Sequence, residues 1–437
     1  MAKLKKKNPS TNSLPGPANI TRRELSNGIV VLARENFTSP SVVVDGDLRV
    51  GALWHSREMA GLSDFTAAML MRGNERLGFN EIYEQIESLG ASLSVSGGTH
   101  TSGFYIKCLS EDVNVLMGLA ADALRRPTFP AEEVERLRGQ IITRLKIGAN
   151  DTRGRASEAF YEAAYQNHPY SVEEDGYPET IAALTREQMV DFHRQHFGPR
   201  GMTVTVVGAV KTEDAVALVE KHFGDWHNAA QMPQPELPAL QPLNGFIKRA
   251  VGLPGKAQSD VLLGAPGPTR ANPHFLAARL GNSIIGQFGM GGRIGHQVRE
   301  KNGMAYYAGM SLNGGLGPGG WYAYAGVNPT NVEKAVELML AEFKKIISQK
   351  VTAQELEDNQ AQFLGRLPLS LETNEGVASM ISSMELYNLG LDYLHRYPDL
   401  IKAITRADIQ EAFRAFINPA NMVLAVAGPE QKRELDD

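Results

Sequence analysis

The sequence predicts an α+β fold made of two homologous domains, and three features lead to this prediction. Hairpin-type strands are mixed with long helices in each half, and the two do not strictly alternate. Such an order favours an antiparallel-rich sheet with helices packed on one side. Stretches of the first half recur in the second half, and a proline-rich stretch at residues 228–248 separates the halves.

The repeat is visible in three pairs of matching stretches that lie 220 to 222 residues apart. The pairs are residues 184–186 with 404–406, 199–208 with 419–428, and 133–145 with 355–367. A period of this length indicates two duplicated domains rather than a solenoid, whose repeats run to about 50 residues. We therefore expect a disordered basic arm at 1–20, an N-terminal domain at 21–227, a stiff linker at 228–248 and a C-terminal domain at 249–437.

The first half can be divided into elements in chain order. Asn27-Gly28 lies between apolar stretches and predicts a hairpin, and Gly97-Gly98 joins two further strands. Thr185 is the expected N-cap of a helix. The remaining expected strands are residues 41–50, 90–96, 101–109 and 201–208, and the remaining expected helices are 61–73, 81–89, 113–124 and 132–146.

Composition limits the possible classes of protein. The 437 residues contain 43% hydrophobic and 21% charged residues and carry a formal net charge of -5, so we expect a globular protein that does not bind nucleic acid. Cys108 is the single cysteine and excludes an intramolecular disulfide. No apolar run is long enough for a transmembrane helix. We expect a cytoplasmic location as written, or a periplasmic one if a leader has been removed.

The stretch Gly61 to Gly73 carries the first chemical signal. Its apolar residues Leu62, Phe65, Met69 and Leu70 recur at helical spacing and predict a buried helix with glycine at both ends. The stretch resembles the active-site helix of the pitrilysin / mitochondrial-processing-peptidase (insulinase) family of zinc peptidases. In that family the helix carries His-x-x-Glu-His, in which the two histidines bind zinc and the glutamate is the general base.

The resemblance implies a helix without its chemistry. The three motif positions are occupied here by Asp64, Ala67 and Ala68, and Arg144 or Leu145 stands where the family places its third ligand, a glutamate. A catalytic zinc needs three protein ligands. We therefore expect no metal, no cofactor and no catalytic residue in this chain.

A second motif extends from Phe288 to Tyr306. A glycine-rich turn is followed by Arg299, Glu300, Gly303 and Tyr306, similar to the family's Arg-Glu-x-x-Gly-x-x-Tyr. In the family the arginine and tyrosine face the zinc across a cavity and hold the substrate backbone. The resemblance therefore implies that Arg299 and Tyr306 bind substrate, and that the two domains face each other around a cavity.

Other interpretations of the same residues remain open. The glycine spacing near 289–295 suggests a nucleotide loop but lacks the Lys-Ser/Thr that would follow. Arg299 could instead pair with a surface carboxylate and Tyr306 could be a core residue. His193 and His196 have metal-like spacing beside Asp191, yet the segment is typical of a solvated amphipathic helix. We expect residues 168–170 to form a structural turn, and residues 92–96 to form a sheet edge.

These observations lead to one hypothesis and three alternatives. We expect the non-catalytic, substrate-binding subunit of a heterodimeric zinc metallopeptidase, whose sister subunit binds the zinc and whose substrate is a peptide or an unfolded protein. The alternatives are a structural subunit, the substrate-recognising subunit of a mitochondrial processing peptidase, and a standalone peptide-binding homodimer. The substrate itself and any new role of Asp64 stay open.

Overall fold

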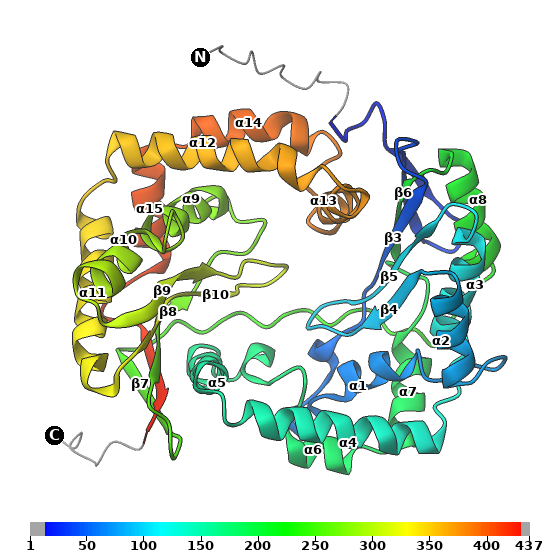
Figure 1. Cartoon of the computed structure of the whole chain (residues 1–437), viewed down its shortest axis with the longest axis horizontal. Helices are drawn as coiled ribbons and strands as arrows, with labels where there is room; N and C mark the ends of the chain where they lie inside the picture. Colours follow the sequence, from blue (N-terminus) through cyan, green and yellow to red (C-terminus); the bar gives the residue numbers. More distant parts are fainter. Residues whose placement is uncertain (1–13, 430–437) are drawn as a thin grey trace.

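The computed structural model describes residues 14–429 and has an α+β architecture of two similar halves that surround a central space (Figure 1). The first half contains a six-stranded sheet of order β1-β2-β6-β3-β5-β4, and the second half a five-stranded sheet of order β7-β11-β8-β10-β9. Most neighbouring strands are antiparallel, whereas β2 with β6 and β7 with β11 are parallel. The predicted fold class is confirmed.

The first half follows the predicted order closely. Its strands are β1 (Thr21–Glu24), β2 (Val30–Glu35), β3 (Ser41–Leu48), β4 (Ser92–Ser96), β5 (Ser102–Leu109) and β6 (Thr203–Gly208). Its helices are α1 (Leu62–Met69), α2 (Phe79–Ser88), α3 (Val113–Arg125), α4 (Ala131–Gly148), α5 (Thr152–Ala164), α6 (Pro178–Ala183), α7 (Arg186–His196) and α8 (Thr212–Phe223). The hairpin at Asn27-Gly28 joins β1 and β2 as expected, and the Thr185 hydroxyl caps α7.

The second half repeats this arrangement. Its strands are β7 (Ile247–Gly252), β8 (Ser259–Pro266), β9 (Ala305–Leu312), β10 (Gly320–Val327) and β11 (Val423–Gly428). Its helices are α9 (Phe275–Gly286), α10 (Gly292–Gly295), a π-helical turn (His296–Lys301), α11 (Val332–Ser348), α12 (Ala353–Ser370), α13 (Asn374–Leu386), α14 (Tyr393–Ala403) and α15 (Arg406–Phe416). By these bounds α4 and α12 begin and end 222 residues apart, and α7 and α15 begin and end 220 residues apart. The structure therefore confirms the internal duplication.

The two halves exchange one helix each. Helix α5 of the first half packs on β7, β8 and β11, and helix α13 of the second half packs on β3 and β6 (Figure 1). Phe160 of α5 lies in one core with Val423, and Ile381 of α13 lies in one core with Val43 and Val207. Each sheet is thus covered on one face by helices of its own half and on the other by a helix of the opposite half. Neither helix was predicted from the sequence, and neither was this exchange.

The expected arm and linker can be compared with the described part of the chain. Residues 1–13 of the arm lie outside the described residues, but from Leu14 on the chain forms a turn, and Ile20 is buried. The described structure therefore begins before the expected boundary. Between α8 and β7 the chain has neither helix nor strand and runs across the molecule (Figure 1). Gln234 ties this linker to the first half by donating to the carbonyl of His100 at 2.9 Å. Among residues 14–429, no helix is long and apolar enough to cross a membrane.

Because the exchanged helices contribute to both cores, we expect the chain to unfold in one cooperative step. Ile381→Val removes one methylene from a fully buried side chain in α13 and should lower the free energy of unfolding by about 1 kcal/mol. Urea titrations followed by tryptophan fluorescence and by circular dichroism should give coincident transitions, shifted together. The control Ile147→Val, at an exposed position on α4, should shift neither. Two separate transitions would contradict a shared core.

Candidate functional site

Helix α1 has the predicted burial but ends earlier than expected. Phe65 and Met69 are fully buried, and the helix begins after Gly61, which has a φ of 90°. Only glycine adopts this φ readily, and a Cβ at this position would lie 2.5 Å from the side chain of Ile181. The helix ends at Met69, and a turn leads from there to Gly73.

The structure brings the degenerate zinc-motif positions together. Arg144 of α4 places its Nη2 atom 3.9 Å from Oδ2 of Asp64 and 3.6 Å from Oδ2 of Asp175. The neighbouring Leu145 packs against the first core instead, so Arg144 is the residue that faces α1. Gly97, in the turn after β4, lies against Asp64, because a Cβ there would be 2.8 Å from the Cα of Asp64.

This group of residues does not fit a zinc ion. Ala67 and Ala68 have no donor atoms, and a guanidinium cation occupies the side of the site where a third ligand would be needed. Among residues 14–429, no group of three or more His, Cys, Asp or Glu side chains is arranged to hold a metal ion. Arg144 offers positive charge to Asp64 in place of a metal, but it cannot activate water.

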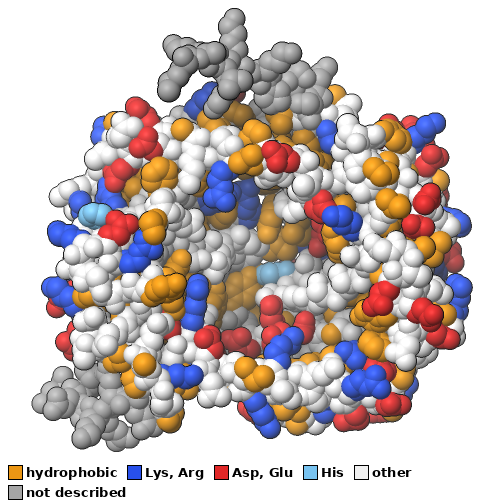
Figure 2. Space-filling model, viewed as in Figure 1, with side chains coloured by type: hydrophobic (Ala, Val, Ile, Leu, Met, Phe, Trp, Pro, Cys, Tyr) orange, Lys and Arg blue, Asp and Glu red, His pale blue; other side chains and the backbone are white. Residues whose placement is uncertain are grey.

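Negative charge accumulates around the same position. Burial raises the pKa of Asp64 to about 6, and repulsion from Asp175 and Glu174 adds to this effect against the attraction of Arg144. Burial and nearby carboxylates, Glu158 first, likewise raise the pKa of Glu173 to about 7. Figure 2 shows acidic side chains near a hollow between the two halves. Ionised Asp64 is therefore costly in the folded state.

We expect Asp64→Asn to stabilise the protein above pH 7. The folded pKa of about 6 exceeds the ordinary aspartate pKa of 3.8, so the native state loses stability as the pH rises from 4 through 6. The shift corresponds to about 3 kcal/mol at pH 8, and the difference between variant and parent should fade as the pH falls below about 4. Urea unfolding at several pH values measures it. Asp392→Asn is the control and should change the stability in the opposite direction, because hydrogen bonds from Arg396 lower the pKa of Asp392. A stability difference for Asp64→Asn that does not depend on pH would contradict this electrostatic account.

Arg299 and Tyr306 both come from irregular backbone. Arg299 lies in the π-helical turn, where its side chain is 24% exposed and its Nη2 atom is 3.5 Å from Oε1 of Glu300. Tyr306 is 88% exposed on β9, the edge strand of the second sheet. Tyr307 pairs with Gly326 and Ala305 with Val327, so Tyr306 is the extra residue of a β-bulge. The alternative that Tyr306 is a core residue is wrong.

The two groups of predicted site residues remain separate within this chain. Neither Arg299 nor Tyr306 forms a hydrogen bond or an ion pair with Asp64 or Arg144 in the described part of the chain. Strand β4 lies at the end of its sheet, as expected for an edge. The glycine-rich loop between β9 and β10 is a hairpin, and its Asn313 donates to the Tyr161 hydroxyl at 3.1 Å.

Among residues 14–429 no histidine belongs to a group that could hold a metal ion, and one expectation about the histidines is wrong. The α7 histidines were expected on a solvated helix, whereas His196 is 8% exposed and packs on Trp54, with ring centroids 4.1 Å apart. His193 pairs through Nε2 with the carbonyl of Leu124 at 2.8 Å. Of Asp191, His193 and His196, only Asp191 is exposed, and it pairs with Arg194. The turn at 168–170 is structural, as predicted, because His168 Nδ1 accepts from the Tyr170 amide.

Two polar networks near the second motif were not found from the sequence. Buried Asp260 accepts from Tyr307, and Arg293 forms a two-point ion pair with Glu355. The helical spacing of Ala156, Phe160 and Ala163 could have revealed α5, whose N-cap is Asp151. No local pattern, however, indicates that α5 crosses to the other sheet.

Two family models match the chain over most of its length. Residues 30–173 match the model described as Insulinase (Peptidase family M16), and residues 183–363 match the model described as Peptidase M16 inactive domain. An uncharacterized zinc protease of Rickettsia bellii is 23% identical over 92% of this chain and 98% of its own length. One of Mycobacterium leprae is 24% identical over 84% of this chain and 83% of its own length.

Solved structures show the same fold. A peptidase M16 inactive domain from Pseudomonas fluorescens superposes with a TM-score of 0.86 at 22% identity, covering 95% of this chain and 100% of that one. A protease from Helicobacter pylori superposes with a TM-score of 0.89 at 19% identity over the same shares of the two chains. With the family models and the degenerate α1 helix, these comparisons place the chain in the M16 (insulinase) peptidase family, as a member of its non-catalytic type.

Proposed function

We propose that this chain is the substrate-binding, non-catalytic subunit of a heterodimeric zinc metallopeptidase. A zinc-bearing sister subunit of the same family would hold the metal and the general base. This chain would close the chamber and contribute Arg299 and Tyr306 to bind the peptide substrate.

The proposal rests on a difference between the two motifs: the first lacks the family's zinc-binding residues, and the second keeps the family's arginine and tyrosine. The α1 position has lost its donor atoms and gained the Arg144 cation, whereas the second motif retains both of its polar side chains. Tyr306 is 88% exposed and forms no hydrogen bond in the described chain, so its hydroxyl is available to a ligand. An exposed tyrosine at a β-bulge favours a ligand-binding role over a purely structural one, because bulges are common beside functional sites.

The chemistry of the pair suits peptide binding. The guanidinium of Arg299 has fixed N–H donors that can hold a backbone carbonyl, and the Tyr306 hydroxyl can donate one more hydrogen bond to developing negative charge. Arg299 is only loosely paired, since in the described part of the chain the one carboxylate contact of its guanidinium is to Glu300 at 3.5 Å. Both residues can therefore meet substrate without first breaking a strong interaction.

Complementation of activity tests the proposal. A quenched, unstructured peptide of about 20 residues is offered to this chain, to a zinc-bearing sister and to their mixture, with zinc measured in each. We expect zinc in the sister and rapid cleavage only in the mixture. Zinc and cleavage in this chain alone would refute the proposal. A stable but inactive mixture would favour a structural subunit, and peptide binding by a homodimer without the sister would favour the standalone alternative.

A further inference from the structure

The segment from Gly292 to Tyr307 carries both proposed substrate-binding residues on backbone of uncommon geometry. Arg299 lies in a π-helical turn and Tyr306 in a β-bulge. Both irregularities interrupt the regular hydrogen-bond pattern, and each persists only where its surroundings support it. Two polar networks lie at the two ends of this segment.

The C-terminal end is held by a buried carboxylate. Asp260 of β8 is 2% exposed and accepts a short hydrogen bond from the Tyr307 hydroxyl. Asp260 also accepts from Thr152 Oγ1 at 2.5 Å and from Gln258 Nε2 at 3.2 Å. A buried carboxylate without such donors would be strongly unfavourable, so Tyr307 has a fixed partner next to the bulge.

The Tyr307 ring is held in place as well as its hydroxyl. It lies across Gly326, where a Cβ would come within 2.7 Å of the ring atom Cζ. The Arg153 guanidinium lies 5.5 Å from the ring centroid on the α5 side. Burial, together with the Asp260 carboxylate, raises the pKa of Tyr307 and keeps its hydroxyl as a donor. Because Thr152 and Arg153 belong to α5, the exchanged helix of the first half takes part in this contact.

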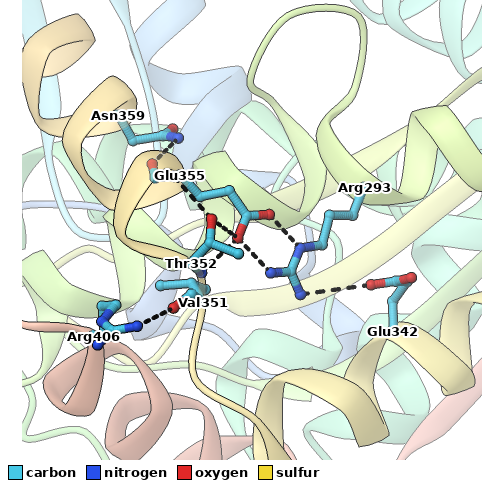
Figure 3. Close-up of polar contacts among 7 residues, drawn as sticks. All are labelled: Arg293, Glu342, Val351, Thr352, Glu355, Asn359 and Arg406. Carbon is cyan, nitrogen blue, oxygen red and sulfur yellow. Dashed lines mark hydrogen bonds and ion pairs between the residues drawn. The ribbon is translucent and has the colours of Figure 1, made fainter.

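The N-terminal end is held by an ion pair. Arg293 donates through Nε and Nη2 to the two carboxylate oxygens of Glu355, each at 2.7 Å, and its Nη1 lies 3.8 Å from Oε2 of the buried Glu342 (Figure 3). Burial alone would raise the pKa of Glu355, but hydrogen bonds from Arg293 and Thr352 outweigh this effect and lower it to about 2. Glu355 also belongs to the capping box of α12. The start of the segment is therefore fixed to the first turn of a long helix.

We propose that the Arg293–Glu355 ion pair and the Tyr307–Asp260 hydrogen bond are positioning contacts that hold Arg299 and Tyr306 in the geometry that binds substrate. The inference rests on the proposed function. Tyr307 acts on Tyr306 through the adjacent peptide bond, by fixing the strand register at the bulge. Arg293 acts on Arg299 by fixing the short helix that leads into the π-helical turn.

A double-mutant cycle tests this coupling in the complex with the zinc-bearing sister. Tyr307→Phe removes only the hydroxyl and should lower kcat/KM about 10-fold to 100-fold, because small misplacements of binding groups are costly. In a Tyr306→Ala background the same change should have almost no further effect, since the group that it positions is absent. Tyr324→Phe is the matched control, because Tyr324 lies in the adjacent strand with its ring centroid 5.0 Å from the same Arg153 guanidinium, and its hydroxyl forms no hydrogen bond in the described chain. It should change kcat/KM less than twofold.

The cycle separates failure of the inference from failure of the proposed function. If Tyr306→Ala lowers kcat/KM but Tyr307→Phe does not, or lowers it equally in both backgrounds, the positioning role is refuted and the proposed function stands. If Tyr306→Ala leaves kcat/KM unchanged, both are refuted.

Hydrogen exchange in the chain alone gives a second measurement that needs no sister subunit. Tyr307→Phe and Arg293→Lys should speed amide exchange in residues 296–307 at least about 10-fold, because each removes one end support of the segment. Arg396→Lys changes a similar two-point pair, an exposed one with Asp392 at the start of α14, and should leave exchange in residues 296–307 unaltered. Unchanged amide exchange in both Tyr307→Phe and Arg293→Lys would overturn the inference.

Discussion

Arg299→Ala in this chain should lower the kcat/KM of the proposed complex by about 10² to 10³, although the proposal assigns the zinc to the other subunit. Removing one donor that stabilises developing negative charge costs about 3 to 4 kcal/mol in the transition state. Tyr306→Phe should act in the same direction with a smaller effect, because it removes a single hydroxyl. Initial rates with the quenched peptide, at saturating sister subunit, measure both.

The control for these variants is a surface arginine on the same half. Arg396→Ala breaks an exposed ion pair with Asp392 on α14, and such pairs contribute little. It should leave kcat/KM unchanged. Light scattering should show that all variants still bind the sister, so that lost activity does not reflect lost assembly. Full activity of a complex with Arg299→Ala would show that Arg299 does not supply a hydrogen-bond donor to the transition state.

The second large effect is the recovery of zinc binding. Asp64→His with Ala68→His supplies two ligands four residues apart on α1, but Arg144 still places a cation beside them. Adding Arg144→Glu removes that cation and supplies the third ligand. Loss of a group that merely orients a ligand costs about 10-fold to 100-fold in metal affinity, so the added ligand should tighten zinc binding at least about 100-fold.

Competition with a chromogenic chelator measures the zinc affinity of both variants. Ala67 is left unchanged, because it is fully buried and its family counterpart is a base rather than a ligand. Arg366→Glu, at the position of α12 that corresponds to Arg144 across the 222-residue repeat, is the control for added negative charge and should not improve zinc binding. Equal affinity of the two-histidine and three-ligand variants would show that α4 does not supply the third position.

The features that could be predicted are those that depend on residues close together in the sequence or on repeated stretches. The duplication could be predicted because matching stretches keep their spacing, and the caps at Thr185 and Thr405 mark the start of equivalent helices. The family frame located Asp64 and Arg144 at ligand positions, but their contact was not predicted from the sequence. The lack of donor atoms at Ala67 and Ala68 could be read from the sequence alone.

The remaining features depend on contacts between residues distant in the sequence. Helix α5 has an ordinary apolar stripe, and nothing within residues 152–164 specifies the opposite sheet as its partner. The inward orientation of His196 depends on Trp54, about 140 positions earlier in the printed sequence. Likewise, Asp260 and Tyr307 meet only because β8 and β9 both pair with β10. Amphipathic periodicity cannot supply such pairings, because it describes one element at a time.

The most direct test of the split site is a crosslink from Tyr306 to substrate. A photoreactive phenylalanine analogue replaces Tyr306, and the labelled peptide is added with an inactive, zinc-bearing sister. The same analogue at Tyr83, a partly exposed tyrosine on α2 of the first half, is the control. We predict crosslinking of the peptide at position 306, dependent on the sister, and little at position 83. An active complex in which position 306 never crosslinks to peptide would contradict the proposal that this chain contributes Tyr306 to the chamber.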